Sequence, residues 1–138
     1  MFEEVSSPEA HNILQKSIDV VLIDVRSSME YEYVGHPVGS IHIPIKESPE
    51  WEILPNFIDN VKSELMKKFP DTNDLFSIQI LLICRSGRRS GEAALLLESE
   101  GYKNTINIVD GFEGDKDMNG HRSVINGWRF HNLPWEQN

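Results

Sequence analysis

Short apolar runs alternate with amphipathic stretches along the chain, and this alternation predicts the class of fold. Residues 20–24 form a continuous apolar run ending in Asp24, typical of a strand buried on both faces of a parallel sheet. Residues 78–83 form a second apolar run, and residues 104–109 are the last clear strand. Apolar and polar residues alternate over positions 40–43, which predicts a short strand halted by Pro44.

Helical patterns fill the gaps between these strands. Ser7 as N-cap, followed by Pro8, predicts a helix to about residue 15, and residues 27–30 form a capping box that opens a short helix. Two longer helices are expected over residues 55–69 and 88–100, the second ended by Gly101 in a left-handed C-cap. Strands that alternate with helices imply βαβ units. The sequence therefore predicts an α/β sandwich, formed by one domain over residues 1–138.

The only cysteine stands where the second apolar run ends and a helix begins. Cys84 is followed by a loop of small and basic residues: Arg85, Ser86, Gly87, Arg88, Arg89 and Ser90. The backbone N–H groups of such a loop and the N-terminus of the next helix carry partial positive charge, and the arginines add full charges. This setting favours the thiolate, the nucleophilic form of cysteine, and makes the loop the candidate active site. The alternative is a buried cysteine that packs as a small hydrophobe.

Charged residues also follow the other strands. Asp24 and Arg26 close the first run, and Asp110 follows the last strand. Ligands of parallel sheets bind beyond the carboxyl ends of the strands, so Asp24, Cys84 and Asp110 are predicted to converge on one site. Asp24 and Arg26 have a second interpretation, in which they orient the catalytic loop and do not contact substrate.

Charge and cysteine content narrow the possible partners. The formal net charge of −9 argues against general nucleic-acid binding, and it makes the arginines near Cys84 a local anion site. One cysteine cannot form an intramolecular disulfide. The N-terminus lacks the pattern of a signal peptide, and no apolar run approaches the roughly 20 residues that span a membrane. The expected location is a reducing cytoplasm. The five histidines are too scattered for metal-ligand spacing.

Two motifs, in this order and at this spacing, resemble the single-domain rhodanese family of persulfide-forming sulfurtransferases. The first comprises Leu-Ile-Asp-Val-Arg at residues 22–26, Glu30-Tyr31, Gly-His-Pro-Val-Gly-Ser at residues 35–40, and Ile43-Pro44; the second is the loop from Cys84 to Ser90. A weaker C-terminal match comprises Gly101-Tyr102, Val109-Asp110-Gly111, Gly127-Trp128 and Leu133-Pro134. The resemblance covers almost the whole chain. It implies a three-layer α/β/α sandwich with a mostly parallel central sheet of about five strands.

The resemblance also implies a two-step reaction centred on Cys84. Its thiolate takes the outer sulfur of a small anionic donor such as thiosulfate, and an acceptor such as cyanide or a thiol then removes it. A thioredoxin-like protein is one candidate acceptor. Arg85 and one of Arg88 or Arg89 would bind the donor, while the Ser86 and Ser90 hydroxyls would donate to the persulfide. Backbone N–H groups from Arg85 to Ser90 would converge on the sulfur, with Gly87 permitting the tight curve. No metal or organic cofactor is required.

The stretch between Gly111 and Trp128 is longer than the family pattern. Asn119-Gly120 and Asn126-Gly127 are strong turn signals within it. Because it leaves the C-terminal end of a strand, one hypothesis is that it walls the active site and that His121 or Arg122 contacts substrate. The other is an ordinary surface loop. Val38 and His42 also depart from the family pattern, and both are expected to be tolerated.

Two other functions compete with sulfur transfer. Cysteine phosphatases of related fold carry His-Cys-x5-Arg, whereas here Ile83 precedes Cys84, Arg89 gives Cys-x4-Arg, and Ser90 stands in the place of the arginine. The loop is one residue short for phosphate. A non-catalytic regulatory module is the second alternative, and the presence of Cys84 within a full basic loop argues against it.

Overall fold

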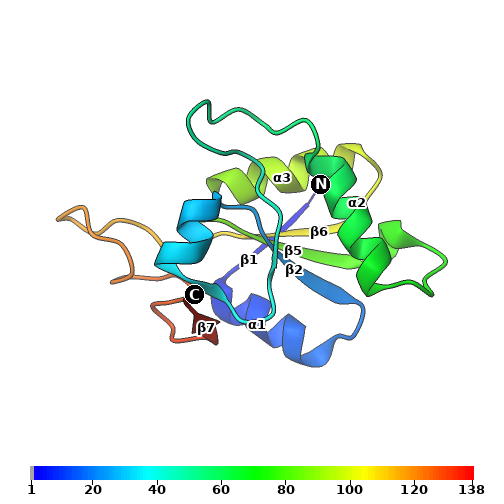
Figure 1. The fold of residues 1–138 in the computed structure, drawn as a ribbon. Coiled ribbons are helices and arrows are strands. Elements are labelled where there is room, and N and C mark those ends of the chain that lie inside the picture. The colour runs from blue at the N-terminus through cyan, green and yellow to red at the C-terminus, as the bar shows by residue number, and fades with distance from the viewer. Residues whose placement is uncertain (1) are drawn as a thin grey trace.

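The computed structural model describes residues 2–138, and a five-stranded parallel sheet lies at its centre (Figure 1). Neighbouring strands follow the order β1-β6-β5-β2-β4, and every pair in this sheet is parallel. The strands are β1 (Glu3–Val5), β2 (Val20–Asp24), β4 (Ile41–His42), β5 (Gln79–Ile83) and β6 (Asn104–Ile108). The expected three-layer sandwich with a mostly parallel sheet of about five strands is confirmed.

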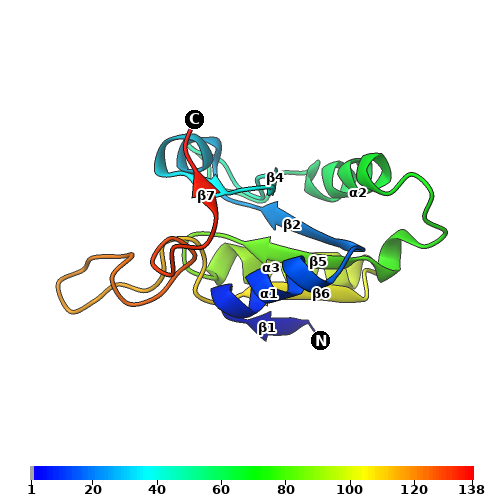
Figure 2. The same cartoon turned by 90° about the horizontal axis from the view of Figure 1, so that it is seen from below.

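Helices cover both faces of the sheet. Helix α1 (Ser7–Lys16) lies on one face, while α2 (Phe57–Lys68) and α3 (Arg88–Ser99) lie on the other (Figures 1 and 2). Each face has its own apolar core: Phe57, Val61, Leu65, Ala94 and Leu97 belong to the α2–α3 side, and Ala10, Phe112 and Trp128 belong to the α1 side. Every residue of β2 is buried, because this strand is covered from both sides.

The start of α1 shows how local chemistry sets an element. Ser6, not Ser7, is the N-cap: its side chain accepts from the Glu9 N–H, and the Glu9 carboxylate accepts from the Ser6 N–H at 2.9 Å. The sequence prediction of Ser7 as N-cap is therefore wrong by one residue. Ser7 is buried, and its N–H and hydroxyl donate to Asp110 at 2.9 and 2.7 Å. Helix α1 is thus tied to the loop after β6.

Several short elements differ from the sequence prediction or were not predicted. Strand β1 places two exposed glutamates outward and pairs with β6 through its backbone. The short helix expected after residue 27 contains a π-helix, η1 (Glu30–Val34), and a 3-10 turn, η2 (Leu75–Ser77), precedes β5. The sequence predicts a turn at residues 35–39. Part of it forms β3 (His36–Pro37), which pairs antiparallel with β7 (Trp135–Glu136) near the C-terminus (Figure 2).

Because all five strands of the central sheet are parallel, their carboxyl ends meet at one edge. Strand β2 leads into residues 25–34, β5 leads into the Cys84 loop, and β6 leads into residues 109–134. This edge carries the loops that form the site. Among residues 2–138, no helix has the length and apolar character needed to cross a membrane.

Candidate active site

Cys84 lies directly after β5, at the base of a loop that ends in the first residue of α3. The cysteine is 1% exposed. Its Sγ accepts a hydrogen bond from the Gly87 N–H at 3.1 Å. Gly87 is the N-cap of α3 and has a φ of +98°, and a Cβ at this position would overlap the Val109 carbonyl oxygen. The loop therefore needs glycine here, both for the left-handed backbone and for the close approach to the chain after β6.

Ser90 and Asn107 form the wall behind the sulfur. Ser90 is fully buried on α3, and its Oγ lies 3.1 Å from Cys84 Sγ. The same hydroxyl donates to Asn107 Oδ1 at 2.5 Å. Asn107 also donates from Nδ2 to the Gly87 carbonyl at 3.1 Å. Asn107 was not among the predicted site residues, although a lone amide between Ile106 and Ile108 in a buried strand is a sequence signal for a residue with a specific hydrogen-bonding role.

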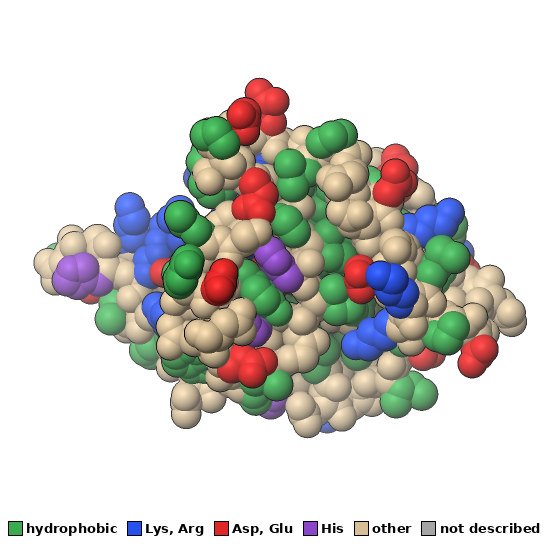
Figure 3. Space-filling model, in the orientation of Figure 1, with side chains coloured by type: hydrophobic (Ala, Val, Ile, Leu, Met, Phe, Trp, Pro, Cys, Tyr) green, Lys and Arg blue, Asp and Glu red, His purple; other side chains and the backbone are tan. Residues whose placement is uncertain are grey.

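A pocket of about 480 Å³ opens over the thiol. It is lined by Cys84, Arg85, Ser86, Arg88, Arg89, Asp115, Lys116 and Arg122. The lining holds five basic side chains and one acidic one, in a protein of net charge −9. The segment between Gly111 and Trp128 projects from the molecule (Figure 1). Lys and Arg side chains gather at its base (Figure 3). The excess of basic side chains gives the pocket a positive potential, which attracts anions.

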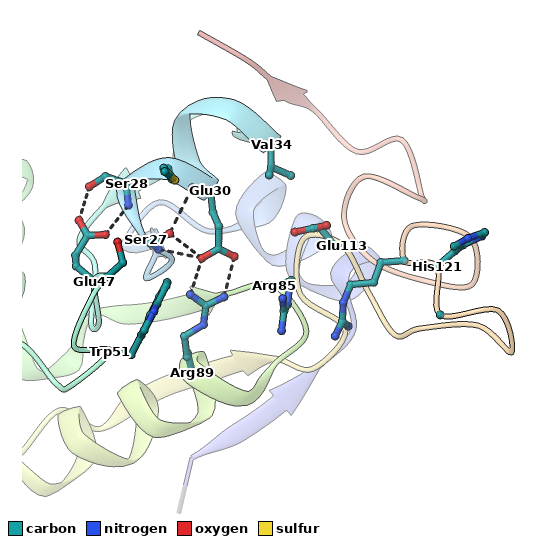
Figure 4. A pocket seen from close by; sticks show the side chains of 14 residues that line it. Ser27, Ser28, Glu30, Val34, Glu47, Trp51, Arg85, Arg89, Glu113 and His121 are labelled. Atoms are coloured by element: carbon teal, nitrogen blue, oxygen red, sulfur yellow. Dashed lines mark hydrogen bonds and ion pairs between the residues drawn. The ribbon is translucent and has the colours of Figure 1, made fainter.

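Arg89 is held by an ion pair with η1. Its guanidinium bonds both carboxylate oxygens of Glu30, Nη1 to Oε1 at 2.7 Å and Nη2 to Oε2 at 2.9 Å (Figure 4). Burial alone would raise the pKa of Glu30, but the hydrogen bonds and charge of Arg89 outweigh it and lower that pKa to about 2. The pKa of Arg89 is raised, because the bonds to Glu30 outweigh the opposing effect of burial. With Arg89 engaged in this way, Arg85 and Arg88 are the loop arginines best placed for a bound anion.

Asp24 and Arg26 form a fully buried ion pair below the site. Arg26 Nη2 lies 2.7 Å from Asp24 Oδ2 and donates to the Gly35 carbonyl at 2.6 Å. The Arg26 guanidinium lies over the Phe112 ring, 4.4 Å from its centroid. Neither residue of the pair lines the pocket over Cys84. Their geometry fits the second interpretation, in which they hold the surrounding loops in place.

Asp110 has a structural position as well. Its Oδ1 accepts from Ser7, and its Oδ2 accepts from the Gly127 N–H at 2.9 Å. The expected position of Asp24, Cys84 and Asp110 at the carboxyl ends of neighbouring parallel strands is confirmed. The three residues share a sheet edge, but among them only Cys84 belongs to the lining of the pocket.

The stretch from Gly111 to Trp128 is attached to the Cys84 loop through its backbone. The Phe112 N–H donates to the Cys84 carbonyl at 2.8 Å, and the Glu113 N–H donates to the Arg85 carbonyl at 3.0 Å. Gly111 has a φ of +66°, and a Cβ there would lie 2.5 Å from the Arg85 carbonyl oxygen. This stretch also brings Asp115, Lys116 and Arg122 to the pocket. It forms a wall of the candidate site, as one of the two hypotheses from the sequence expects.

A larger cavity of about 1350 Å³ adjoins the thiol pocket. Both are lined by Arg85, Arg89 and Arg122. The larger cavity extends between Trp51 and Glu47 on one side and Glu113 and His121 on the other (Figure 4). His121 thus belongs to this outer space, whereas Arg122 borders both cavities.

Comparison with known proteins identifies relatives over the whole chain. A family model described as "Rhodanese-like domain" matches residues 7–117. The "Uncharacterized protein RP600 homolog" of Rickettsia rickettsii is 34% identical over 137 residues, which cover 97% of each chain. The "Thiosulfate sulfurtransferase GlpE" of Haemophilus influenzae is 26% identical over 113 residues, covering 82% of this chain and 87% of GlpE. The crystal structure of Rv0390 from M. tuberculosis superimposes with a TM-score of 0.80 at 28% identity, over 100% of both chains.

Proposed function

The chain belongs to the rhodanese-like domain family, and on this basis we propose that it is a sulfurtransferase that carries sulfur as a persulfide on Cys84. The proposed donor is a small anion such as thiosulfate, and the proposed acceptor is cyanide or a thiol. The observation that carries the proposal is the position of the only cysteine, whose sulfur accepts from the Gly87 N–H at the base of a pocket lined by basic side chains. The similarity to GlpE supports it.

The proposed reaction has two displacement steps. In the first, the Cys84 thiolate attacks the outer sulfur of thiosulfate, a sulfur–sulfur bond forms, and sulfite leaves with the electron pair of the bond that breaks. In the second, cyanide attacks the outer sulfur of the persulfide, and thiocyanate leaves as the Cys84 thiolate is restored. The thiol proton passes to solvent before the first step. Atoms and electrons balance without a metal or an organic cofactor.

The basic and hydroxyl side chains of the pocket have proposed roles in these steps. Arg85 and Arg88 bind the oxygens of the donor, together with Lys116 and Arg122, which line the same pocket. The Gly87 N–H stabilises negative charge on Sγ. The Ser86 hydroxyl donates to the outer sulfur of the persulfide. Arg89, bonded to Glu30, keeps the loop in shape.

Mass spectrometry tests the proposal directly. Incubation with thiosulfate should add one sulfur atom to the peptide that contains Cys84, and cyanide should remove it as thiocyanate. Cys84→Ser should show neither change. No added sulfur with any anionic sulfur donor would contradict the proposal.

The geometry argues against the phosphatase alternative. A phosphate cradle needs an arginine six positions after the cysteine, and Ser90 occupies that position, fully buried and bonded to Asn107. Arg89, one position earlier, is bonded to Glu30. Release of p-nitrophenol from p-nitrophenyl phosphate, without formation of thiocyanate from thiosulfate and cyanide, would reverse this choice. The presence of Cys84 likewise argues against a non-catalytic module.

The proposed setting is a reducing cytoplasm, where a lone thiol and its persulfide persist. The outer cavity beside the thiol pocket offers room for a larger thiol acceptor, for which a thioredoxin-like protein is one candidate. We propose neither nucleic acid nor a membrane as a partner, since the net charge of −9 disfavours binding to polyanionic surfaces.

A further inference from the structure

The hydroxyl of Ser90 has one hydrogen, and two neighbours compete for it. Its Oγ lies 3.1 Å from Cys84 Sγ and 2.5 Å from Asn107 Oδ1. In the contact with sulfur, either atom can donate. In the contact with Asn107, the amide oxygen can only accept. The direction of the Ser90 hydrogen bond therefore depends on how the Asn107 amide is turned.

The other contacts of Asn107 fix that orientation. Its Nδ2 donates to the Gly87 carbonyl at 3.1 Å and to Glu4 Oε2 at 3.3 Å. A carbonyl and a carboxylate are both acceptors, so a reversed amide would set its oxygen against two other oxygens. The Asn107 oxygen therefore faces Ser90, and the Ser90 hydrogen points at Asn107.

This arrangement determines whether Ser90 presents a lone pair or a hydrogen to the Cys84 sulfur. Ser90 turns an oxygen lone pair toward Cys84, so a neutral thiol can donate its S–H to Oγ. A thiolate at 3.1 Å would face the same lone pair and gain no hydrogen bond from Ser90. To stabilise the thiolate, the hydroxyl must swing away from Asn107, which is 2% exposed, and leave its amide oxygen unpaired. A buried acceptor without a partner is unfavourable.

We propose that Asn107 is a positioning residue that holds the Ser90 hydroxyl as an acceptor toward Cys84, so that the loaded persulfide is favoured over the free thiolate. The inference rests on the proposed sulfur transfer. In the persulfide, the negative charge moves to the outer sulfur within the basic pocket, and Sγ becomes a neutral bridging atom that needs no donor from Ser90. Asn107 thus favours retention of the bound sulfur and makes Cys84 a poorer leaving group toward the acceptor.

Asn107 also contacts the Cys84 loop through Gly87. A test must therefore separate the orientation of the Ser90 hydroxyl from the support of the loop. The bond from Asn107 to the Gly87 carbonyl supports the residue whose N–H donates to the sulfur. A substitution at position 107 would loosen this support whatever happens at Ser90. A double-mutant cycle with Ser90→Ala removes this ambiguity, because the loop contact is lost equally in both backgrounds.

The first measurement is the rate of Cys84 alkylation by iodoacetamide as a function of pH, in the full chain. On the acid limb of the profile, Asn107→Leu should raise the rate about tenfold, because the freed Ser90 hydrogen can then donate to the thiolate. In the Ser90→Ala background, the same substitution should change the rate by less than about twofold. The charged groups that face the sulfur are the same in every variant: Arg85, Arg88, Arg89, Asp115, Lys116 and Arg122, with Glu4 behind Asn107.

The second measurement follows the loaded protein. After loading with thiosulfate, the Asn107→Leu persulfide should lose its sulfur to cyanide about tenfold faster than the wild-type persulfide, because the departing thiolate gains a donor. Asn107→Val serves as a second variant if thermal unfolding shows that the leucine variant does not fold.

Equal effects of the position-107 substitution in the wild-type and Ser90→Ala backgrounds would overturn the inference, as would an alkylation profile that Asn107→Leu leaves unchanged. Alkylation requires no sulfur donor. A failure of thiosulfate to load Cys84 would therefore count against the proposed function, while the alkylation cycle would still decide the role of Asn107.

Discussion

The bond between Glu30 and Arg89 joins two separate elements of the site through single side chains. Glu30 lies on η1, which follows β2, and Arg89 lies in the first turn of α3. Their side chains are 18% and 16% exposed, so solvent screens the pair only in part. The ion pair engages the Arg89 guanidinium at the border of the pocket and fixes the start of the helix that carries Ser90.

The contribution of the Glu30–Arg89 ion pair to the free energy of unfolding should depend on pH. The pKa of Glu30 is lowered in the folded protein from 4.5 to about 2, so its contribution is complete above pH 4.5 and is lost as the pH falls toward 2. Its size is on the order of 3 kcal/mol, from the conversion of a pKa shift into free energy. Urea denaturation of wild type and Glu30→Gln should therefore show a difference in the free energy of unfolding at pH 7 that shrinks below pH 4.5.

Glu64→Gln is the matched control for that measurement. Glu64 forms an exposed pair with Lys67 on α2, at 3.4 Å, and such pairs contribute about 0–1 kcal/mol. A difference between wild type and Glu30→Gln that stays constant from pH 7 to acid pH would contradict the ion-pair argument.

The buried Asp24–Arg26 pair yields a prediction of a different kind. Arg26→Met should lower the free energy of unfolding by about 3–5 kcal/mol, because it leaves the fully buried Asp24 carboxylate without its partner. The double variant Asp24→Leu/Arg26→Met should recover most of that loss. Folded Arg26→Met, assayed well below its melting temperature, should retain the wild-type KM for thiosulfate. A raised KM in a variant of normal stability would place Arg26 in the donor site instead.

At the scale of elements, the strand–loop–helix around Cys84 was predictable because its signals are local. An apolar strand, a glycine that permits positive φ, and a helix with an apolar face each follow from a few consecutive residues. The helix N-cap at Ser6 was predictable from the capping box that Ser6 forms with Glu9. Strand β1 was not predictable, because it exists through its pairing with β6, over 100 residues later in the chain. Asn107 was missed for the same reason: its importance comes from Ser90 and Gly87, which only the fold brings to it.

The segment between Gly111 and Trp128 contributes charge to the pocket, and its role can be measured. Lys116→Met/Arg122→Met should raise the KM for thiosulfate about tenfold with little change in kcat, because the basic side chains bind the donor equally before and during reaction. Lys67→Met/Lys103→Met is the control with the same change in net charge at exposed positions far from the pocket, and its KM should match wild type. If both double variants behave alike, the effect comes from overall charge and the wall is only a surface loop.

For the molecule as a whole, the C-terminal end is part of the site's support. The family model ends at residue 117, yet the later residues pack on the core. Trp128 is 1% exposed and donates from Nε1 to the Pro134 carbonyl at 2.9 Å. That carbonyl also accepts from the Val38 N–H, and β7 pairs with β3. The sequence signals at Gly127-Trp128 and Leu133-Pro134 identified the C-terminal region as part of the fold. They did not predict that it would bind the segment around β3.

Truncation tests whether the pairing of β7 with β3 and the bonds to the Pro134 carbonyl support the whole fold. A chain that ends at Leu133 loses β7 and the acceptor of the buried Trp128 N–H, and Trp135 no longer packs edge-on against Phe112, whose N–H donates to the Cys84 carbonyl. Its free energy of unfolding should fall by about 3 kcal/mol, from an unpaired buried donor and lost apolar burial. A chain that ends at Glu136 keeps β7 and should lie within about 0.5 kcal/mol of the full chain, the usual range for surface changes.

The two truncations also show whether the loss of β7 weakens thiosulfate binding in addition to lowering stability. Because Trp135 contacts the ring of Phe112, the chain that ends at Leu133 should bind thiosulfate more weakly even at temperatures where it is fully folded, whereas the chain that ends at Glu136 should not. Urea denaturation of each chain, together with the KM for thiosulfate, separates the two effects. Equal stability and equal KM in the two chains would show that β7 is an appendage, and that the support of the Cys84 loop ends with the backbone contacts of Phe112 and Glu113.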